Sequence, residues 1–175
     1  ASQLHSLESQ PDTGQADAIN RGFARASGEI LCYLNSDDLL LPGSLEFVSA
    51  YFSRHPDVDA LYGNRIIVDS NGREVGRWVL PDHRDDVLKW ADYVPQETLF
   101  WRRRVWEKLG GFDESFHFAL DWDFLLRMIE HEFRIVHVSR FLGAFRTHEH
   151  QKTLTREGQR REESDRIYRR LHGYV

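Results

Sequence analysis

The stretch EILCYLNSDD, residues 29–38, joins a short apolar run to a polar, acidic one. Its first six residues are rich in strand-forming side chains, and a run of this length is typical of a buried parallel strand. The polar run ends the strand, which places Asp37 and Asp38 at its carboxyl end. Because α/β sheets bind ligands at the carboxyl ends of their strands, the stretch predicts an α/β fold with a site beside these two carboxylates.

Helices are expected on both sides of this strand. Residues 15–26 carry apolar side chains at helical spacing, and Gly28 follows as a stop signal. After the acidic run, Pro42 suits the first turn of a second helix that runs to about residue 55. The order helix, strand, acidic loop, helix predicts a sheet that is parallel in its first half.

The pattern changes beyond Pro56. Strand-like residues 60–63 and 65–68, a polar turn at 69–72 and a return at 77–80 predict an antiparallel insertion. Further helices are expected at 85–90, 104–109 and 121–131, and further strands at 98–101, 135–138 and 142–146. The sequence therefore predicts a mixed sheet flanked by helices over residues 1–150, followed by a basic helical segment over residues 151–175.

Composition and charge limit the possible partners and location. The chain has 175 residues, 41% of them hydrophobic, which is enough for one core. Its net charge of −5 is a poor match for a polyanion, so we expect no nucleic-acid partner. The single cysteine, Cys32, excludes an internal disulfide and favours a cytoplasmic location. No apolar run approaches the roughly 18 residues of a membrane span, and the basic C-terminal segment leaves open a peripheral contact with the inner face of the membrane.

Three acidic or basic side chains near strand ends are candidates for a metal site. Asp37 and Asp38 would suit Mg²⁺ or Mn²⁺, which proteins hold by one or two carboxylates together with substrate phosphates. The same pair would also suit a solvated loop or the N-cap of the helix after Pro42. His148 follows an apolar strand, where a histidine is more often a surface or core residue than a ligand, but its imidazole would complete a metal site begun by the acidic pair.

A second acidic cluster, Asp121 and Asp123 on either side of Trp122, opens a predicted helix. Either carboxylate would be stabilised by the helix dipole, which is a purely structural explanation. A carboxylate beside Trp122 would also serve as a general base, since desolvation raises its pKa. Gln96 and the arginines at 102–104 are weaker signals, and the arginines are also explained as a solvated face.

Three stretches, taken in chain order, resemble glycosyltransferase family 2, whose members have the GT-A fold. They are GQADAINRGFARASGEILCYLNSDDLLLPGSL (14–45), PQETLFWRRRVWEKLGGFDESFHFALDWDFLLR (95–127) and FRTH (145–148). The resemblance covers about residues 9–150. It implies inverting transfer of a sugar from a nucleoside-diphosphate sugar to a carbohydrate or lipid-linked acceptor, with Mn²⁺ or Mg²⁺ as cofactor.

The resemblance also implies roles for single residues. Residues 35–38 look like the family's acidic metal and diphosphate motif, with Asn35 in place of the more usual leading aspartate, and His148 matches a histidine that approaches the metal. Asp121 matches the catalytic base, although Leu120 stands where many members carry glutamate. The residues expected at the substrate are Asp17, Asn20, Gln96 and Asp37.

Family members begin with two strands that contact the nucleotide, and both would lie upstream of Ala1. The resemblance therefore implies an N-terminally incomplete GT-A domain that is inactive alone and associates into a homo-oligomer. The residues alone are also compatible with two other classes of protein. One is a non-catalytic, transferase-like binding module that has lost nucleotide binding. The other is a metal-dependent phosphoryl-transfer enzyme or nuclease, which would need a two-metal cluster and a basic track.

Overall fold

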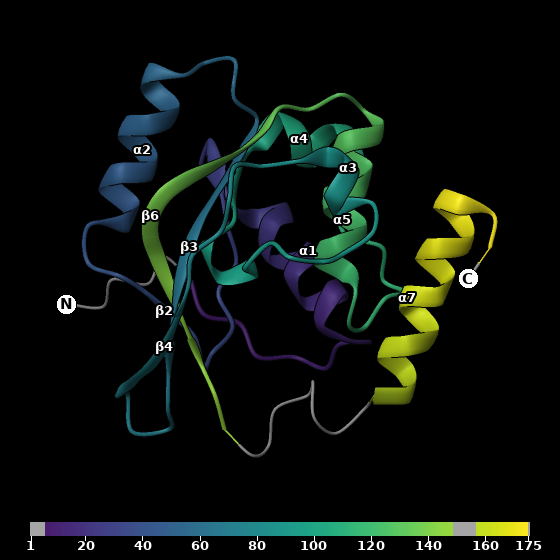
Figure 1. Ribbon diagram of the computed structural model, residues 1–175, viewed down its shortest axis with the longest axis horizontal. Helices are drawn as coiled ribbons and strands as arrows, with labels where there is room; N and C mark the ends of the chain where they lie inside the picture. Colours follow the sequence, from purple (N-terminus) through teal and green to yellow (C-terminus); the bar gives the residue numbers. More distant parts are fainter. Residues whose placement is uncertain (1–5, 149–156, 175) are drawn as a thin grey trace.

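The computed structural model describes residues 6–148 and 157–174. In chain order its elements are α1 (Gln15–Arg25), β1 (Ile30–Leu31), β2 (Leu39–Leu40), α2 (Ser44–Arg54), β3 (Ala60–Val68), β4 (Glu74–Trp78), α3 (Asp85–Leu88), the 3₁₀ turn η1 (Gln96–Thr98), β5 (Phe100–Arg102), α4 (Arg103–Leu109), α5 (Leu120–Glu130), β6 (Ile135–Arg146) and α7 (Glu157–His172). Figure 1 shows a curled sheet with α2 on one side and α1, α4 and α5 on the other, and α7 beyond them.

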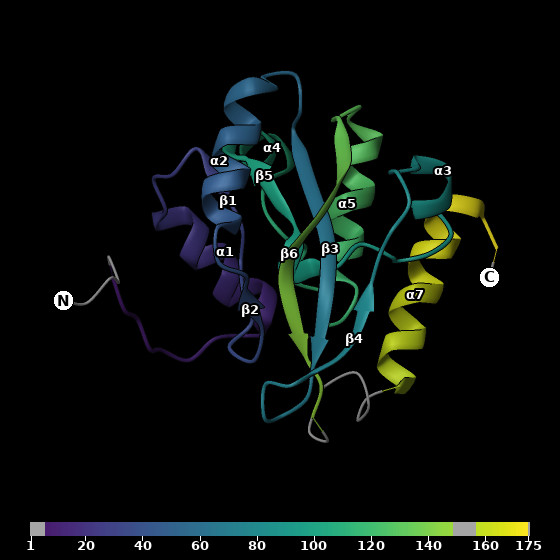
Figure 2. The same cartoon turned by 60° about the vertical axis from the view of Figure 1, so that its left-hand side comes forward.

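The sheet is mixed, with strand order β1-β5-β3-β6-β2, and β4 pairs with β3. The parallel pair β3 and β6 runs through its centre, from Ala60 beside Ile135 to Val68 beside Arg146 (Figure 2). The other pairings are antiparallel. Because β3 and β6 are parallel, their carboxyl ends emerge at the same end of the sheet, next to the loops that carry the acidic residues.

Two apolar clusters cover the two faces of the sheet. Alternation along the strands divides the side chains, so that Tyr62 and Trp101 belong to one cluster and Leu61 and Phe100 to the other. The larger cluster takes side chains from α1, α4 and α5, and the smaller one is closed by α2. Cys32 packs at the edge of the smaller cluster, where burial raises the pKa of its thiol to about 11.

The predicted helices of the first 148 residues are present, but the predicted strand pairing is wrong in the first half. The strand near Ile30 is not parallel to a neighbour: it pairs antiparallel with β5, Ile30 beside Arg102. Its partner is fixed by contacts about 70 residues away, which local periodicity does not report.

The prediction that residues 60–80 form an antiparallel insertion is only partly right. The β3–β4 hairpin is antiparallel as expected, but β3 is one continuous strand at the centre of the sheet. Residues 135–146 likewise form one strand, whose register shifts opposite Gly63 and Asn64. At Gly63 a Cβ atom would lie 2.5 Å from the carbonyl oxygen of Arg140, so a glycine is required at this irregularity.

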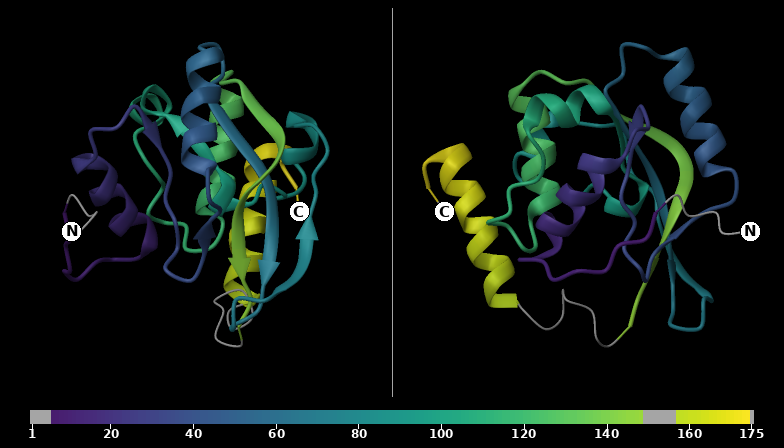
Figure 3. Two further views of the ribbon diagram at one scale, coloured as in Figure 1. Left: turned by 90° about the vertical axis from the view of Figure 1, so that its left-hand side faces the viewer. Right: turned by 180° about the vertical axis from the view of Figure 1, so that it is seen from behind.

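The helix α7 packs against the rest of the fold (Figure 3). Its Ile167 is fully buried in the larger apolar cluster, and the Tyr168 hydroxyl donates a hydrogen bond to the carbonyl of Trp90 at 2.7 Å. The part of the predicted C-terminal helix before Glu157 lies outside the described residues. Among the described helices, none has both the length and the apolar character needed to cross a membrane.

Candidate active site

A cavity of about 1160 Å³ lies where the sheet, the start of α5 and α7 meet. In Figure 1 the sheet and α7 stand on opposite sides of this region, with α5 between them. The residues that line it include Gln15, Tyr33, Asn35, Asp37, Asp38, Arg65, Trp78, Asp92, Gln96, Glu97, Asp121, Phe145, His148, Arg160, Arg161 and Asp165. Five of the predicted site residues are therefore brought to one cavity from four separate parts of the chain.

The acidic end of the cavity is formed where the loop after β1 meets the end of β6. The backbone N–H of Arg146 donates to the Asp38 carboxylate at 3.1 Å, and the Asp37 carboxylate lies 3.0 Å from Nε2 of His148. Desolvation, together with the negative charges of Glu97 and Asp37, raises the pKa of Asp38 to about 6, against the opposing hydrogen bond from the Arg146 N–H. The two adjacent carboxylates and the histidine form one surface of the cavity.

The predicted substrate residue Gln96 supports this acidic loop. Its side-chain amide donates to the carbonyl of Tyr33 at 2.8 Å, and its oxygen accepts from Asn35 at 3.1 Å. Asn35 also accepts a hydrogen bond from Gln15 at 2.9 Å. Asn35, the departure from the family's usual aspartate, is thus a neutral hydrogen-bonding link between α1, the acidic loop and η1.

A buried ion pair that the sequence did not suggest lies beside these carboxylates. Nε of Arg65 donates to Glu97 at 2.8 Å, and the Glu97 side chain is almost fully buried. The guanidinium lies over the rings of Trp78 and Phe145, at 5.2 and 4.7 Å from their centroids. The one available signal was an arginine inside the apolar run 60–68, since a buried arginine requires an acidic partner.

The start of α5 places Asp121 in the cavity. Desolvation raises the pKa of its carboxyl to about 6, opposed by hydrogen bonds from backbone N–H groups and by the positive charge of Arg65. A second cavity carboxyl, Asp92, was missed by the sequence analysis. Its pKa is raised well above the usual value by desolvation and by the charge of Asp121. The pair gives this wall a proton acceptor that is ionised at neutral pH beside one that is harder to ionise.

The orientation of α5 depends on α7. The Glu163 carboxylate accepts hydrogen bonds from three consecutive backbone N–H groups, those of His117, Phe118 and Ala119, at 2.8 to 3.1 Å. These donors lie at the N-terminus of α5, where a negative charge also interacts favourably with the helix dipole. A side chain 42 positions after Asp121 therefore fixes the turn from which Asp121 projects, and no local pattern in the sequence reveals it.

Asp123 differs from Asp121 although it is only two residues away. Its side chain is 1% exposed and accepts from Nε of Arg127 at 2.8 Å and from Nη1 of Arg170 at 2.6 Å. Arg127 in turn donates to the carbonyls of Leu109 and Gly111. Asp123 is thus part of a structural ion-pair network rather than of the cavity.

Two predicted substrate residues, Asp17 and Asn20, lie outside the set of described residues that line the cavity. Asp17 accepts from the backbone N–H of Thr13 at 2.9 Å and pairs with Arg21 at 2.7 Å. Asn20 exchanges two hydrogen bonds with the backbone of Phe112, at 2.9 and 3.0 Å. Asp17 therefore stabilises the start of α1, whereas Asn20 ties α1 to the backbone of Phe112.

The residues at the acidic end fit a divalent cation that is completed by substrate. Within residues 6–148 and 157–174, no group of three or more histidine, cysteine or acidic side chains is arranged to hold a metal by itself. Asp37 and Asp38 nevertheless offer hard oxygen donors, and the nearby Glu97 adds to a local excess of negative charge. Mg²⁺ and Mn²⁺ suit such sites, because they retain water and bind substrate phosphates alongside one or two carboxylates.

Comparison with known proteins connects this geometry to a family. The sequence profile described as Glycosyl transferase family 2 matches residues 4–120. The O-antigen biosynthesis protein RfbC of Myxococcus xanthus is 30% identical over 138 residues, which are 79% of this chain and 11% of that protein. A PGL/p-HBAD biosynthesis glycosyltransferase of Mycobacterium bovis (strain BCG / Pasteur 1173P2) is 32% identical over 117 residues, 66% of this chain and 44% of that protein.

Solved structures share the fold. The Staphylococcus aureus protein TarS, residues 1–349 in complex with UDP-GlcNAc, matches with a TM-score of 0.62 and 19% identity over 88% of this chain and 44% of that one. The mannosyltransferase PcManGT from Pyrobaculum calidifontis, in complex with GDP-Man and Mn²⁺, matches with a TM-score of 0.64 and 19% identity over 94% and 45%. The chain spans less than half the length of each of these four proteins. The chain has the GT-A fold and belongs to glycosyl transferase family 2.

Proposed function

We propose that this chain carries the metal-binding carboxylates and the general base of an inverting transfer, in which a sugar passes from a nucleoside-diphosphate sugar to an acceptor hydroxyl. The observation that carries the proposal is the single cavity that contains both the Asp37–Asp38 pair and the carboxylate of Asp121. The known ligands of related folds support it, because TarS was solved with UDP-GlcNAc and PcManGT with GDP-Man and Mn²⁺.

Asp37 and Asp38 would hold Mn²⁺ or Mg²⁺, with His148 orienting Asp37 through their 3.0 Å contact. When bound, such a cation supplies positive charge that offsets the negative charge of a departing nucleoside diphosphate. The Arg146 N–H fixes the Asp38 carboxylate, and the bonds among Asn35, Gln96 and Tyr33 fix the loop.

Asp121 is the proposed general base. Its oxygen would remove the proton from the acceptor hydroxyl as that oxygen attacks the anomeric carbon from the side opposite the leaving diphosphate, so one displacement inverts the configuration. A pKa of about 6 suits the role, because the group is ionised at neutral pH and is more basic than an ordinary carboxylate. No covalent sugar intermediate is needed, which agrees with Cys32 lying in the core with a raised thiol pKa.

The test is a transfer assay on the full-length protein, with a panel of UDP- and GDP-sugars as donors and simple glycosides as acceptors, in Mn²⁺ or Mg²⁺ and in EDTA. We expect transfer that needs the metal and a product whose anomeric configuration, read from NMR coupling constants, is opposite to that of the donor. A product with retained configuration, or undiminished transfer in EDTA, would contradict the mechanism. Donor binding without any transfer would favour a non-catalytic binding module.

A further inference from the structure

Trp78 presents an aromatic ring to the cavity from an unusual position. It is the last residue of β4, lines the cavity and is 38% exposed. Ligand cavities are commonly lined by aromatic side chains, so a partly exposed indole at a cavity wall is a candidate contact for a ligand.

The neighbours of Trp78 hold the ring in place. The Arg65 guanidinium lies 5.2 Å from the indole centroid and 4.7 Å from that of Phe145, and Glu97 fixes the guanidinium from the interior. Arg65 and Trp78 are also direct partners in the β3–β4 ladder. The ring is therefore supported on one side by a buried, ion-paired layer, which limits the entropy that it loses when a ligand stacks on it.

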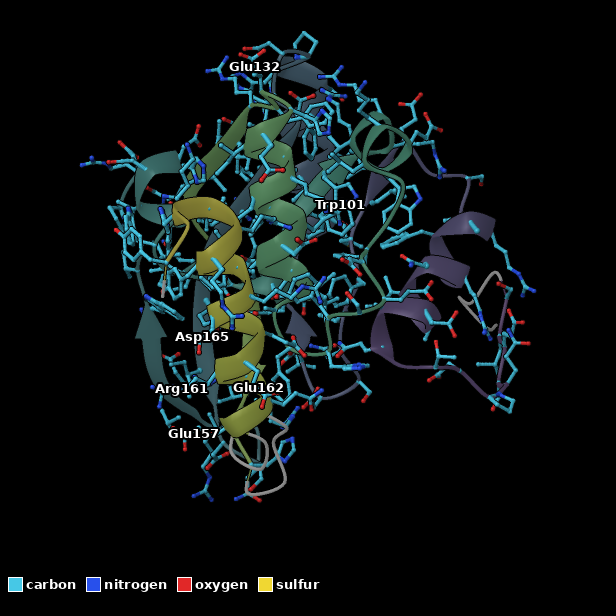
Figure 4. The ribbon with its side chains drawn as sticks, turned by 90° about the vertical axis from the view of Figure 1, so that its right-hand side faces the viewer. Trp101, Glu132, Glu157, Arg161, Glu162 and Asp165 are labelled. Carbon is cyan, nitrogen blue, oxygen red and sulfur yellow. The ribbon has the colours of Figure 1, made fainter. Side chains whose placement is uncertain are left out.

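The α7 wall of the same cavity supplies free polar groups. Glu157, Arg161 and Asp165 recur every four residues and share one side of α7, while Glu162 points to another side (Figure 4). Among the described residues, the side chains of Arg161 and Asp165 take part in no hydrogen bond or ion pair, and both line the cavity. Arg161 offers hydrogen-bond donors and Asp165 offers acceptors, and their opposite charges balance.

These features fit a sugar better than a phosphate or an alkyl chain. The C–H groups on one face of a pyranose ring match the negative face of an indole, and its hydroxyls match paired donors and acceptors. Arg160 and Arg161 would attract a phosphate, but Glu157 and Asp165 would repel it, so this wall has no net positive charge to hold one. An alkyl chain would leave Arg161 and Asp165 desolvated without partners.

We propose that Trp78, with Arg161 and Asp165 across the cavity, forms the subsite for a pyranose unit of a carbohydrate acceptor. The inference rests on the proposed function, because it assigns the hydroxyl that Asp121 would deprotonate to a sugar rather than to a lipid alcohol. In this subsite one face of the pyranose ring lies on the indole of Trp78, and the sugar hydroxyls form hydrogen bonds with Arg161 and Asp165.

The test is saturation-transfer NMR on the full chain with the methyl glycosides of glucose, galactose, mannose and rhamnose as probes. At least one glycoside should receive saturation at its ring C–H protons, and Trp78→Ala should weaken its binding about tenfold. Trp78→Phe should recover most of the affinity because the aromatic face is kept. Trp90→Ala is the matched control, because Trp90 is 51% exposed but stacks on His172 away from the cavity lining.

Unchanged glycoside binding in Trp78→Ala, or binding of a polyprenyl phosphate by a protein that binds none of the glycosides, would overturn the subsite. Either result leaves the proposed function intact if the wild-type protein still cleaves a nucleotide sugar in the transfer assay. Failure of the full-length wild-type protein to cleave any nucleotide sugar would instead count against the proposed function, whether or not the glycosides bind. The two failures are therefore read from separate measurements.

Discussion

Asp121 and Asp123 leave the same helix turn toward different surroundings, and this difference predicts different effects of mutation. Asp123 is the shared partner of Arg127 and Arg170 in the interior. Asp123→Asn would leave these two cations without a full countercharge, and we expect a loss of about 2–4 kcal/mol in the free energy of unfolding, after allowance for the partial exposure of Arg170.

Urea unfolding followed by circular dichroism measures this loss. Asp113→Asn is the control, because Asp113 pairs with Arg166 at the surface and its removal should cost under about 1 kcal/mol. Equal stabilities of the two variants would show that the Asp123 network contributes little.

The pKa of Asp121 predicts the acid limb of the pH profile. A base must be ionised, and desolvation raises the pKa of this carboxyl to about 6. The kcat/KM for the acceptor should therefore be constant above about pH 7 and fall about tenfold per pH unit well below pH 6, because it reports groups that titrate before the acceptor binds. Initial rates at low acceptor concentration between pH 5 and 8 check this, and a kcat/KM that stays flat down to pH 5 would exclude Asp121 as the titrating base.

At the scale of elements, the contact between α7 and α5 predicts that Glu163 affects the rate of transfer although it contacts no reacting atom. Glu163→Gln removes the charge that faces three N–H groups at the start of α5. We expect faster hydrogen exchange at residues 117–119 and a lower kcat, with the KM for the donor unchanged. Glu162→Gln is the matched control on the neighbouring, exposed position, and equal exchange in both variants would contradict the capping role.

Some elements of this fold can be predicted from the sequence, but the pairing of the first strand cannot. The helix α5 follows from local periodicity, since Phe124, Leu125 and Met128 repeat on one face and are buried. The pairing of β1 does not, because Arg102, which pairs with Ile30, is 72 positions away and the run EILCYL is compatible with parallel or antiparallel neighbours. Periodicity reports which face is buried but not which strand lies beside it.

The candidate site likewise contains residues that the sequence predicts and residues that only the folded structure reveals. Asp37, Asp38 and Asp121 follow recognisable acidic motifs, and the structure brings them to one cavity. Glu97 acts through Arg65, 32 positions away, and Glu163 acts through His117, 46 positions away, and its two neighbours. These contacts appear only once the chain is folded. Their roles depend on tertiary geometry, whereas the motif residues are defined by short stretches of sequence.

At the scale of the whole molecule, the outer edge of β1 predicts association. In the described part of the chain, β1 pairs with β5 alone, so its other edge leaves backbone N–H and C=O groups available to another strand. We expect a dimer or larger assembly at micromolar concentration. Light scattering coupled to size exclusion measures the mass, and a particle of 20.6 kDa at all concentrations would contradict this expectation.

The fold also provides a control for experiments on Asp121. The folded state raises the pKa of this carboxyl from 3.8 to about 6, so its ionisation costs stability as the pH rises through this range. Asp121→Asn should therefore be as stable as the wild-type protein at pH 4 and about 1–3 kcal/mol more stable at pH 7.5. A loss of activity in this variant would then not be due to unfolding.

The most direct test of the account is kcat of Asp121→Asn in the transfer assay at pH 7.5, with the donor Kd measured in parallel by calorimetry. If Asp121 removes the acceptor proton, kcat should fall roughly 10²-fold to 10⁴-fold while the donor Kd changes little. Asp123→Asn, compared at a temperature where it is folded, should lose much less. A kcat within tenfold of the wild-type value, or a loss confined to donor affinity, would show that the base lies elsewhere.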